Sequence, residues 1–149
     1  MNLLVIHGPN LNLLGLREPD IYGKRTYKDL IDMIEEICKG CGIDVTAYQS
    51  NHEGAIIDTI HEAYGKYDGI IINPGAYTHY SIAILDDLKS VAIPTIEVHL
   101  SDIHSREEFR NVSITGLAAL KIIYGMGFEG YTLAIKDMKE YLEAQRSNG

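Results

Sequence analysis

The part of the sequence best equipped for chemistry is the stretch from residue 94 to residue 110. An apolar run from Ile93 to Val98 leads directly into a series of polar and charged side chains. A buried strand that ends in such a series is unusual unless the strand end is a functional site. In parallel α/β sheets, ligands bind at the carboxyl ends of the strands. We therefore expect this strand to deliver His99 to a pocket.

Glu97 and His99 are two residues apart, so both side chains point to the same side of an extended strand. A carboxylate beside an imidazole fixes the orientation of the ring and favours its protonated form. This arrangement suits a general acid. The competing interpretation is that His99 is a core histidine with its hydrogen bonds satisfied and no role in chemistry.

Asn10 and Asn73 follow two other apolar runs and are expected to face the same pocket, together with His79, Ser101 and Arg110. Amide and hydroxyl groups can hydrogen-bond the hydroxyls and carbonyls of a ligand without carrying charge. An arginine can bind a carboxylate through two parallel hydrogen bonds. The simpler alternatives are that the histidine caps the following helix and that the arginines after residue 105 form exposed pairs with neighbouring glutamates.

The segment from residue 15 to residue 25 is long for a connection between a strand and a helix, which usually takes about 2–6 residues. Glycine and proline punctuate it too densely for a helix, and long loops in compact domains are often lids. Within it, Arg17 lies close to Tyr22 in sequence. A phenol titrates near ~10, and a nearby cation lowers that value, so Tyr22 could act as a phenolate base. The alternatives are a solvated loop and a surface tyrosine.

Two patterns raise the question of metal or redox chemistry. His99, Asp102 and His104 could bind a metal ion, but an extended chain does not place them on one side. Cys38 and Cys41 form C-x-x-C at the end of a predicted helix, where the helix dipole opposes a thiolate. A zinc site would need two further ligands. We therefore expect partly buried reduced thiols and no metal.

Alternation between apolar runs and helical periodicity repeats five times along the chain. This pattern favours one domain, residues 1–149, with a five-stranded parallel sheet, helices on both faces and a flavodoxin-like three-layer α/β fold. The expected strands are 2–7, 43–49, 69–72, 93–99 and 117–124, and the expected helices are 26–40 (capped by Thr26), 54–64, 81–88 and 129–144, with one helical turn at 106–109. The alternative for residues 115–124 is a helix.

Composition narrows the classes of partner. The 149 residues include 13 basic and 21 acidic side chains, a net charge of −8, which disfavours nucleic acid and anionic membranes. No apolar run approaches the ~20 residues that span a bilayer, and the N-terminus lacks a secretory signal pattern, so we expect a cytoplasmic protein. The first strand end has neither G-x-G-x-x-G nor G-x-x-x-x-G-K, and Pro9 removes an amide that a phosphate loop would use.

The chain as a whole resembles the type II 3-dehydroquinate dehydratases, flavodoxin-like enzymes of the shikimate pathway. The resemblance spans most of the chain, in order and at the family's spacing. It is carried by Ile6-His7-Gly8-Pro9-Asn10-Leu11-Asn12-Leu13-Leu14-Gly15, Arg17-Glu18-Pro19 with Tyr22-Gly23, Gln49-Ser50-Asn51-His52-Glu53-Gly54, Ile72-Asn73-Pro74-Gly75-Ala76-Tyr77-Thr78-His79, and the run from Ile96 to Arg110.

The resemblance implies a role for each matching residue in eliminating water from 3-dehydroquinate. Tyr22 would take a proton from C2, with Arg17 beside it lowering its pKa. His99, oriented by Glu97, would protonate the departing C1 hydroxyl, and Asn10 would hold a water that stabilises the enolate. The substrate-binding positions implied are Asn73, His79, Leu100, Ser101, Arg110 and, reaching the site of a neighbouring subunit, Asp86.

The same resemblance implies trimers that assemble into dodecamers, and a reaction without metal, cofactor or Schiff-base lysine. The sequence departs from the family pattern at Tyr80, where a smaller residue is common, and at Asn111-Val112-Ser113, which replaces a histidine-containing run. Two other functions remain as alternatives. One is a flavodoxin-like module that binds a small ligand without catalysis. The other is a hydrolase using Ser81 or Ser101, which lacks the supporting G-x-S-x-G motif.

Overall fold

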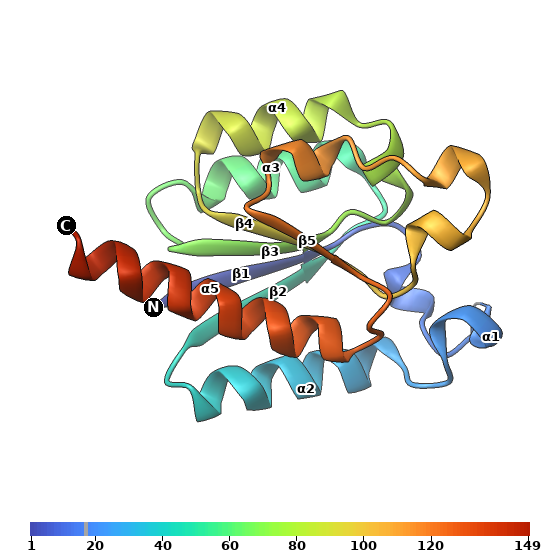
Figure 1. Cartoon of the computed structure of the whole chain (residues 1–149), viewed down its shortest axis with the longest axis horizontal. Helices are drawn as coiled ribbons and strands as arrows, with labels where there is room; N and C mark the ends of the chain where they lie inside the picture. Colours follow the sequence, from blue (N-terminus) through green and yellow to red (C-terminus); the bar gives the residue numbers. More distant parts are fainter. Residues whose placement is uncertain (17) are drawn as a thin grey trace.

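The computed structural model describes residues 1–16 and 18–149, with only the backbone of Tyr22. Five parallel strands form one sheet in the order β2-β1-β3-β4-β5 (Figure 1). This order and the helices on both faces confirm the predicted flavodoxin-like α/β fold. The strands are β1 (Asn2–His7), β2 (Asp44–Gln49), β3 (Gly69–Asn73), β4 (Thr95–His99) and β5 (Lys121–Tyr124).

Helices cover both faces of the sheet (Figure 1). One face carries α2 (Tyr27–Gly40) and α5 (Glu129–Ser147), and the other carries α3 (Glu53–Ala63) and α4 (Ile82–Val91). Short 3-10 turns occur at η1 (Leu11–Leu13), η2 (Gly75–His79), η3 (Ile103–Ser105), η4 (Glu108–Arg110) and η5 (Thr115–Ala118). None of the helices in the described part of the chain is long and apolar enough to cross a membrane.

The core consists of two layers, one on each side of the sheet. Successive side chains of β1 point to opposite faces, so Leu3 and Val5 pack toward α2 and α5 while Leu4 and Ile6 pack toward α3 and α4. Every residue of β3 is buried. Strands covered on both faces are expected to be continuously apolar, which explains why the sequence showed runs rather than alternation here.

The start of α2 follows the predicted cap. The hydroxyl of Thr26 accepts a hydrogen bond from the Asp29 amide at 3.1 Å, and the Asp29 carboxylate accepts one from the Thr26 amide at 2.9 Å. This reciprocal pair satisfies two amides that the first turn of a helix leaves without partners. It fixes where the segment after residue 15 rejoins the core.

Three local predictions need correction. The segment 15–25 contains a one-turn helix, α1 (Pro19–Tyr22), because proline is well suited to the first position of a helix and outweighs the punctuation. Residues 115–124 are neither all strand nor all helix, since η5 precedes β5. The two cysteines are free thiols as expected, but Cys38 is fully buried and Cys41 is exposed.

The ends of β1 and β3 approach each other unusually closely. The Gly8 amide donates a hydrogen bond to the Asn73 carbonyl at 2.8 Å, and a Cβ added at Gly8 would lie 2.3 Å from the carbonyl oxygen of Pro74. A backbone atom cannot move aside as a flexible side chain could. Glycine at position 8 is therefore required for the loops after β1 and β3 to share one edge of the sheet.

Replacing Gly8 by alanine is expected to push the two loops apart and to lower the unfolding free energy by about 1–3 kcal/mol, as overpacking does. Urea denaturation measures the change. The matched control is Gly54→Ala in α3, where an added Cβ meets no atom within 4 Å and alanine favours the helix. Equal stability of the Gly8→Ala variant and the unaltered chain would contradict the close approach.

Candidate active site

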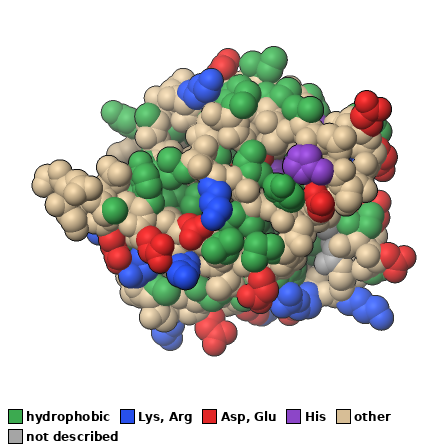
Figure 2. Space-filling view, viewed as in Figure 1, with side chains coloured by type: hydrophobic (Ala, Val, Ile, Leu, Met, Phe, Trp, Pro, Cys, Tyr) green, Lys and Arg blue, Asp and Glu red, His purple; other side chains and the backbone are tan. Residues whose placement is uncertain are grey.

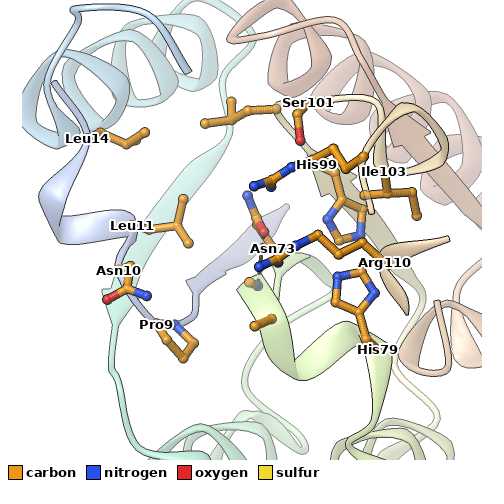
Figure 3. Close-up of a pocket in the computed structure, with 14 residues that line it drawn as sticks. Pro9, Asn10, Leu11, Leu14, Asn73, His79, His99, Ser101, Ile103 and Arg110 are labelled. Atoms are coloured by element: carbon orange, nitrogen blue, oxygen red, sulfur yellow. Dashed lines mark hydrogen bonds between the residues drawn. The ribbon is translucent and has the colours of Figure 1, made fainter. Parts of the chain in front are cut away.

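A pocket opens at the carboxyl ends of β1, β3 and β4 (Figure 3). The loop after β1 forms one wall, η2 lies at its base, and the segment after β4 forms the opposite wall. The lining residues are Pro9, Asn10, Leu11, Leu14, Asn73, Gly75, Ala76, His79, His99, Leu100, Ser101, Ile103, Arg106 and Arg110. The pocket therefore lies where the strand order reverses, the usual ligand position in open α/β sheets.

Most of the predicted pocket residues meet there. Those that line it are Asn10, Asn73, His79, His99, Leu100, Ser101 and Arg110, and Glu97 lies behind His99. Asp86 does not line it and is exposed on α4. Arg17 and the side chain of Tyr22 lie outside the described residues. The sequence did not single out the apolar lining residues Leu11, Leu14 and Ile103.

The Glu97 and His99 side chains form a hydrogen-bonded pair. Nε2 of His99 lies 2.9 Å from Oε2 of Glu97, and the two side chains are almost fully buried. This contact confirms that the two-residue spacing places both groups on the same side of β4. A carboxylate accepts hydrogen bonds, so Nε2 carries the proton in this contact.

Three hydroxyl groups also converge on the Glu97 carboxylate. Oε2 accepts hydrogen bonds from Thr78 at 3.1 Å and from Ser113 at 2.5 Å, while Oε1 accepts one from Thr115. Burial by itself would raise the pKa of Glu97. The hydrogen bond and charge of His99, with the hydroxyls of Ser113 and Thr115, outweigh burial and hold that pKa below its ordinary value. Glu97 is therefore an ionised carboxylate in the interior.

This arrangement leaves the other nitrogen of His99 for the pocket. Within the described part of the chain, Nδ1 makes no hydrogen bond, and the ring lines the cavity. A protonated His99 can donate from Nδ1 while Glu97 stabilises the charge. The geometry of the pair thus allows His99 to donate a proton into the cavity.

His79 takes a defined tautomer. Its Nδ1 lies 2.8 Å from the carbonyl oxygen of Val112, which only accepts, so Nδ1 carries the proton. Burial lowers the pKa of His79 below its ordinary value, more than the carbonyl contact raises it. A neutral ring with Nδ1–H presents Nε2 as a hydrogen-bond acceptor. His79 can therefore receive a hydroxyl of a ligand.

Asn73 is held in one orientation at the end of β3. Its Oδ1 accepts the Gly75 amide at 3.1 Å, and its Nδ2 donates to the Tyr131 hydroxyl at 3.3 Å. One N–H of the amide remains for the pocket. Tyr131 also packs against His7, whose complete burial lowers its pKa to about 3. His7 is therefore a neutral core histidine and not part of the pocket.

Two arginines contribute guanidinium groups to the lining of the pocket. Arg110 binds Glu107 at 2.5 Å and Arg106 lies 3.5 Å from Glu18, yet both line the cavity. The alternative of exposed ion pairs is thus correct for the Arg110–Glu107 contact but does not exclude a role in the pocket. A guanidinium carries five N–H donors, so a contact with Glu107 does not prevent Arg110 from also binding an anionic group such as a carboxylate.

The metal interpretation has no structural counterpart. Among residues 1–16 and 18–149, no group of three or more His, Cys, Asp and Glu side chains is arranged to hold an ion. His104 lies 3.4 Å from Asp102, while His99 is turned toward Glu97.

Sequence patterns did not indicate that Thr78, Ser113 and Thr115 would surround Glu97. Hydroxyl residues in loops are common, and their convergence depends on how residues 113–115 pack on η2. That packing is fixed by a backbone hydrogen bond from the Ile114 amide to the Thr78 carbonyl, at 2.7 Å. No local pattern encodes such a contact.

Comparisons with known proteins show which family the chain resembles. The family described as dehydroquinase class II matches residues 1–139. A 3-dehydroquinate dehydratase of Clostridium perfringens strain 13 is 56% identical over 146 residues, covering 97% of this chain and 100% of the relative. A 3-dehydroquinate dehydratase of Caldicellulosiruptor bescii is 55% identical over 142 residues, covering 95% and 98%.

Solved structures give the same result. The type II dehydroquinase from Butyrivibrio crossotus superposes with a TM-score of 0.92 at 56% identity, covering 93% of this chain and 97% of that one. The type II dehydroquinase from Propionibacterium acnes superposes with a TM-score of 0.88 at 40% identity, covering 95% and 96%.

Thr115→Val is expected to leave Oε1 of Glu97 without its hydroxyl donor and to lower the unfolding free energy at pH 7 by about 1–3 kcal/mol. The lowered pKa of Glu97 contributes stability that is present above its ordinary pKa of 4.5 and is lost as pH falls through the lowered value. The deficit of the variant should therefore shrink in acid. Urea denaturation across this pH range measures it.

The control is Thr115→Ser, which keeps the hydroxyl and loses only a methyl group. A valine variant as stable as the unaltered chain, with a serine variant that is destabilised, would show that packing, and not the hydrogen bond to Glu97, is what the position contributes.

Proposed function

Since the chain belongs to the class II dehydroquinase family, it is a hydro-lyase, and we propose that its strand-end pocket converts 3-dehydroquinate to 3-dehydroshikimate and water. The reaction is a step of the shikimate pathway to aromatic amino acids. The observation that best supports this use of the pocket is the buried Glu97–His99 pair, because the His99 ring lines a cavity that two arginines also line. Residues 1–149 would act as one catalytic domain.

In the proposed mechanism His99 is the acid. The C1 hydroxyl is a poor leaving group until it is protonated, and the imidazolium can supply that proton from Nδ1 while Nε2 stays bonded to Glu97. Glu97 needs no proton of its own, because its lowered pKa keeps it ionised throughout. Its role is to orient the ring and to stabilise the imidazolium.

We assign the base to Tyr22, with Arg17 lowering the pKa of its phenol, from the resemblance of the segment Arg17-Glu18-Pro19 with Tyr22-Gly23 to the family pattern. The base removes the proton from C2, giving an enolate before the hydroxyl leaves. Asn10 would hold a water beside the enolate oxygen, which stabilises the charge that develops there. These assignments use side chains alone, without metal or cofactor.

The remaining pocket residues would bind the substrate. His79 offers an acceptor to a hydroxyl, Asn73 offers one N–H, and the Leu100–Ser101 segment and Arg110 lie opposite them. The positive charge of Arg106 and Arg110 suits a substrate that carries a carboxylate.

We further propose a homo-oligomer, built as trimers within a dodecamer, in which Asp86 completes the pocket of a neighbouring copy. Hydrophobic side chains reach the surface along the edge that carries α4 (Figure 2). Ile82 in the first turn of α4 is 61% exposed, and the nearby turn η5 exposes Leu117. Asp86 lies one turn after Ile82, so both share a face of the helix. A copy that covers this face would meet Asp86.

We also propose that the enzyme works in the cytoplasm, the usual place of a biosynthetic step on a small metabolite. Its net charge of −8 argues against nucleic acid as a partner.

Tyr22→Phe and His99→Ala are each expected to lower turnover by about 10²–10⁴-fold, because each removes a proton-transfer group. The measurement is the rise in ultraviolet absorbance as the conjugated enone forms. It is repeated in EDTA, which tests for a metal, and after borohydride treatment, which tests for a Schiff base. Tyr64→Phe, at an exposed position outside the pocket, is the matched control and should keep full turnover. Near-normal turnover in Tyr22→Phe or His99→Ala would reassign the base or the acid.

Co-expression tests whether Asp86 acts on a neighbour. Asp86→Ala and Tyr22→Phe subunits should each form inactive assemblies, whereas mixed assemblies should recover a fraction of the activity. In a mixed assembly, an Asp86→Ala subunit keeps its own Tyr22 and receives Asp86 from the adjacent copy. Absence of recovery in verified mixed assemblies would place Asp86 outside the shared site.

A further inference from the structure

The loop between β2 and α3 lies behind the loop that carries Asn10, on the side away from the cavity. We propose that Asn51, supported by Gln49, is a positioning residue that holds Asn10 in its catalytic pose and thereby controls turnover. Neither residue lines the pocket. The inference rests on the proposed role of Asn10 in stabilising the enolate.

Asn10 has a backbone conformation that needs support. Its φ is +69° and its ψ is −4°, which places it in the left-handed region. Residues other than glycine are strained in this region, although asparagine is tolerated better than most. Its carbonyl accepts the Leu13 amide at 2.9 Å, which anchors one side of the turn. Its side chain makes no hydrogen bond to any described residue, although it lines the cavity. The side-chain amide is therefore available to a ligand or water, provided the backbone stays in place.

The other side of the turn is anchored by Asn51. Oδ1 of Asn51 accepts the backbone N–H of Asn10 at 3.1 Å. The same oxygen accepts a hydrogen bond from Nε2 of Gln49 at 3.0 Å, and the backbone carbonyl of Asn51 accepts the Tyr77 hydroxyl at 2.9 Å. Asn51 is thus held at both its side chain and its backbone, and it can act as a fixed acceptor.

Gln49 spans the whole turn. Besides Asn51, its Nε2 lies 3.2 Å from the Gly8 carbonyl oxygen and 3.4 Å from Oδ1 of Asn12. All three neighbours are oxygen acceptors, so the amide of Gln49 must face them with its nitrogen. Because the nitrogen of Gln49 is the donor, the side-chain oxygen of Asn51, and not its nitrogen, must face Gln49. The network therefore has one consistent orientation, in which the only backbone donor of Asn10 is occupied.

The expected consequence is an effect on the chemical step more than on binding. Without the Asn51 acceptor, the Asn10 turn can relax toward the ordinary negative φ, which would swing its side chain away from the position of the enolate. A displacement of about 1 Å in a catalytic group can lower the rate on the order of 10²-fold. If the Asn10 side chain is displaced only in part and only in some of the molecules, we expect kcat to fall about tenfold. KM should stay within about twofold of its value in the unaltered enzyme.

Two substitutions at position 51 separate positioning from loop stability. Asn51→Ala removes the acceptor and should lower kcat about tenfold per folded subunit. Asn51→Asp keeps Oδ1 for Asn10 and for Gln49, and should retain the kcat of the unaltered enzyme. Since Asn51 is exposed, both variants are expected to fold and assemble, which thermal denaturation and light scattering check. Gln49→Leu removes the donor that orients Asn51, so it should also lower kcat.

The deciding experiment repeats Asn51→Ala in an Asn10→Ala background. If Asn51 acts through Asn10, the second substitution should change kcat little, so that the two effects are far from additive. Additive losses, or an unchanged kcat in Asn51→Ala when Asn10→Ala is impaired, would overturn the inference. An unchanged kcat in Asn10→Ala would instead overturn the proposed role of Asn10 itself.

Discussion

The buried carboxylate of Glu97 is the constraint on which the rest of the site depends. A charge in a protein interior is strongly destabilising unless it is paired and hydrogen-bonded. Here the donors come from three separate segments, His99 on β4, Thr78 on η2 and the hydroxyls that flank residue 114. Satisfying one charge therefore sets the relative positions of the loops that form the pocket.

The pocket is held in two different ways on its two sides. His99 and the turn η2 are held from inside, by hydrogen bonds that converge on Glu97. The wall after β1 is fixed by backbone, through the close approach of Gly8 to Pro74, and from outside by Gln49 and Asn51. In both arrangements, polar groups that face the cavity can still form hydrogen bonds with a ligand, as a binding site requires.

The sequence predicted the sheet well because β1, β3 and β4 are buried on both faces and so appear as apolar runs. It predicted the Glu97–His99 pair because spacing along a strand determines direction. It could not predict the convergence of Thr78 and Thr115 on Glu97, which depends on contacts between segments far apart in the chain. The helix α1 was not predicted because proline and glycine were interpreted as helix breakers. The roles of Arg17 and Tyr22 stay predictions, since Arg17 and the side chain of Tyr22 lie outside the described part of the chain.

The order of the strands also determines which parts of the site are disrupted when the fold opens partially. β1, β3 and β4 each have a strand on both sides and helices above and below (Figure 1). Core strands of this kind belong to the part of a fold that opens at the highest free energy, whereas outer elements open locally at lower free energy. Asn73 and His99 are the last residues of two such strands. Asn73 and His99 are therefore anchored in the part of the fold that we expect to open last.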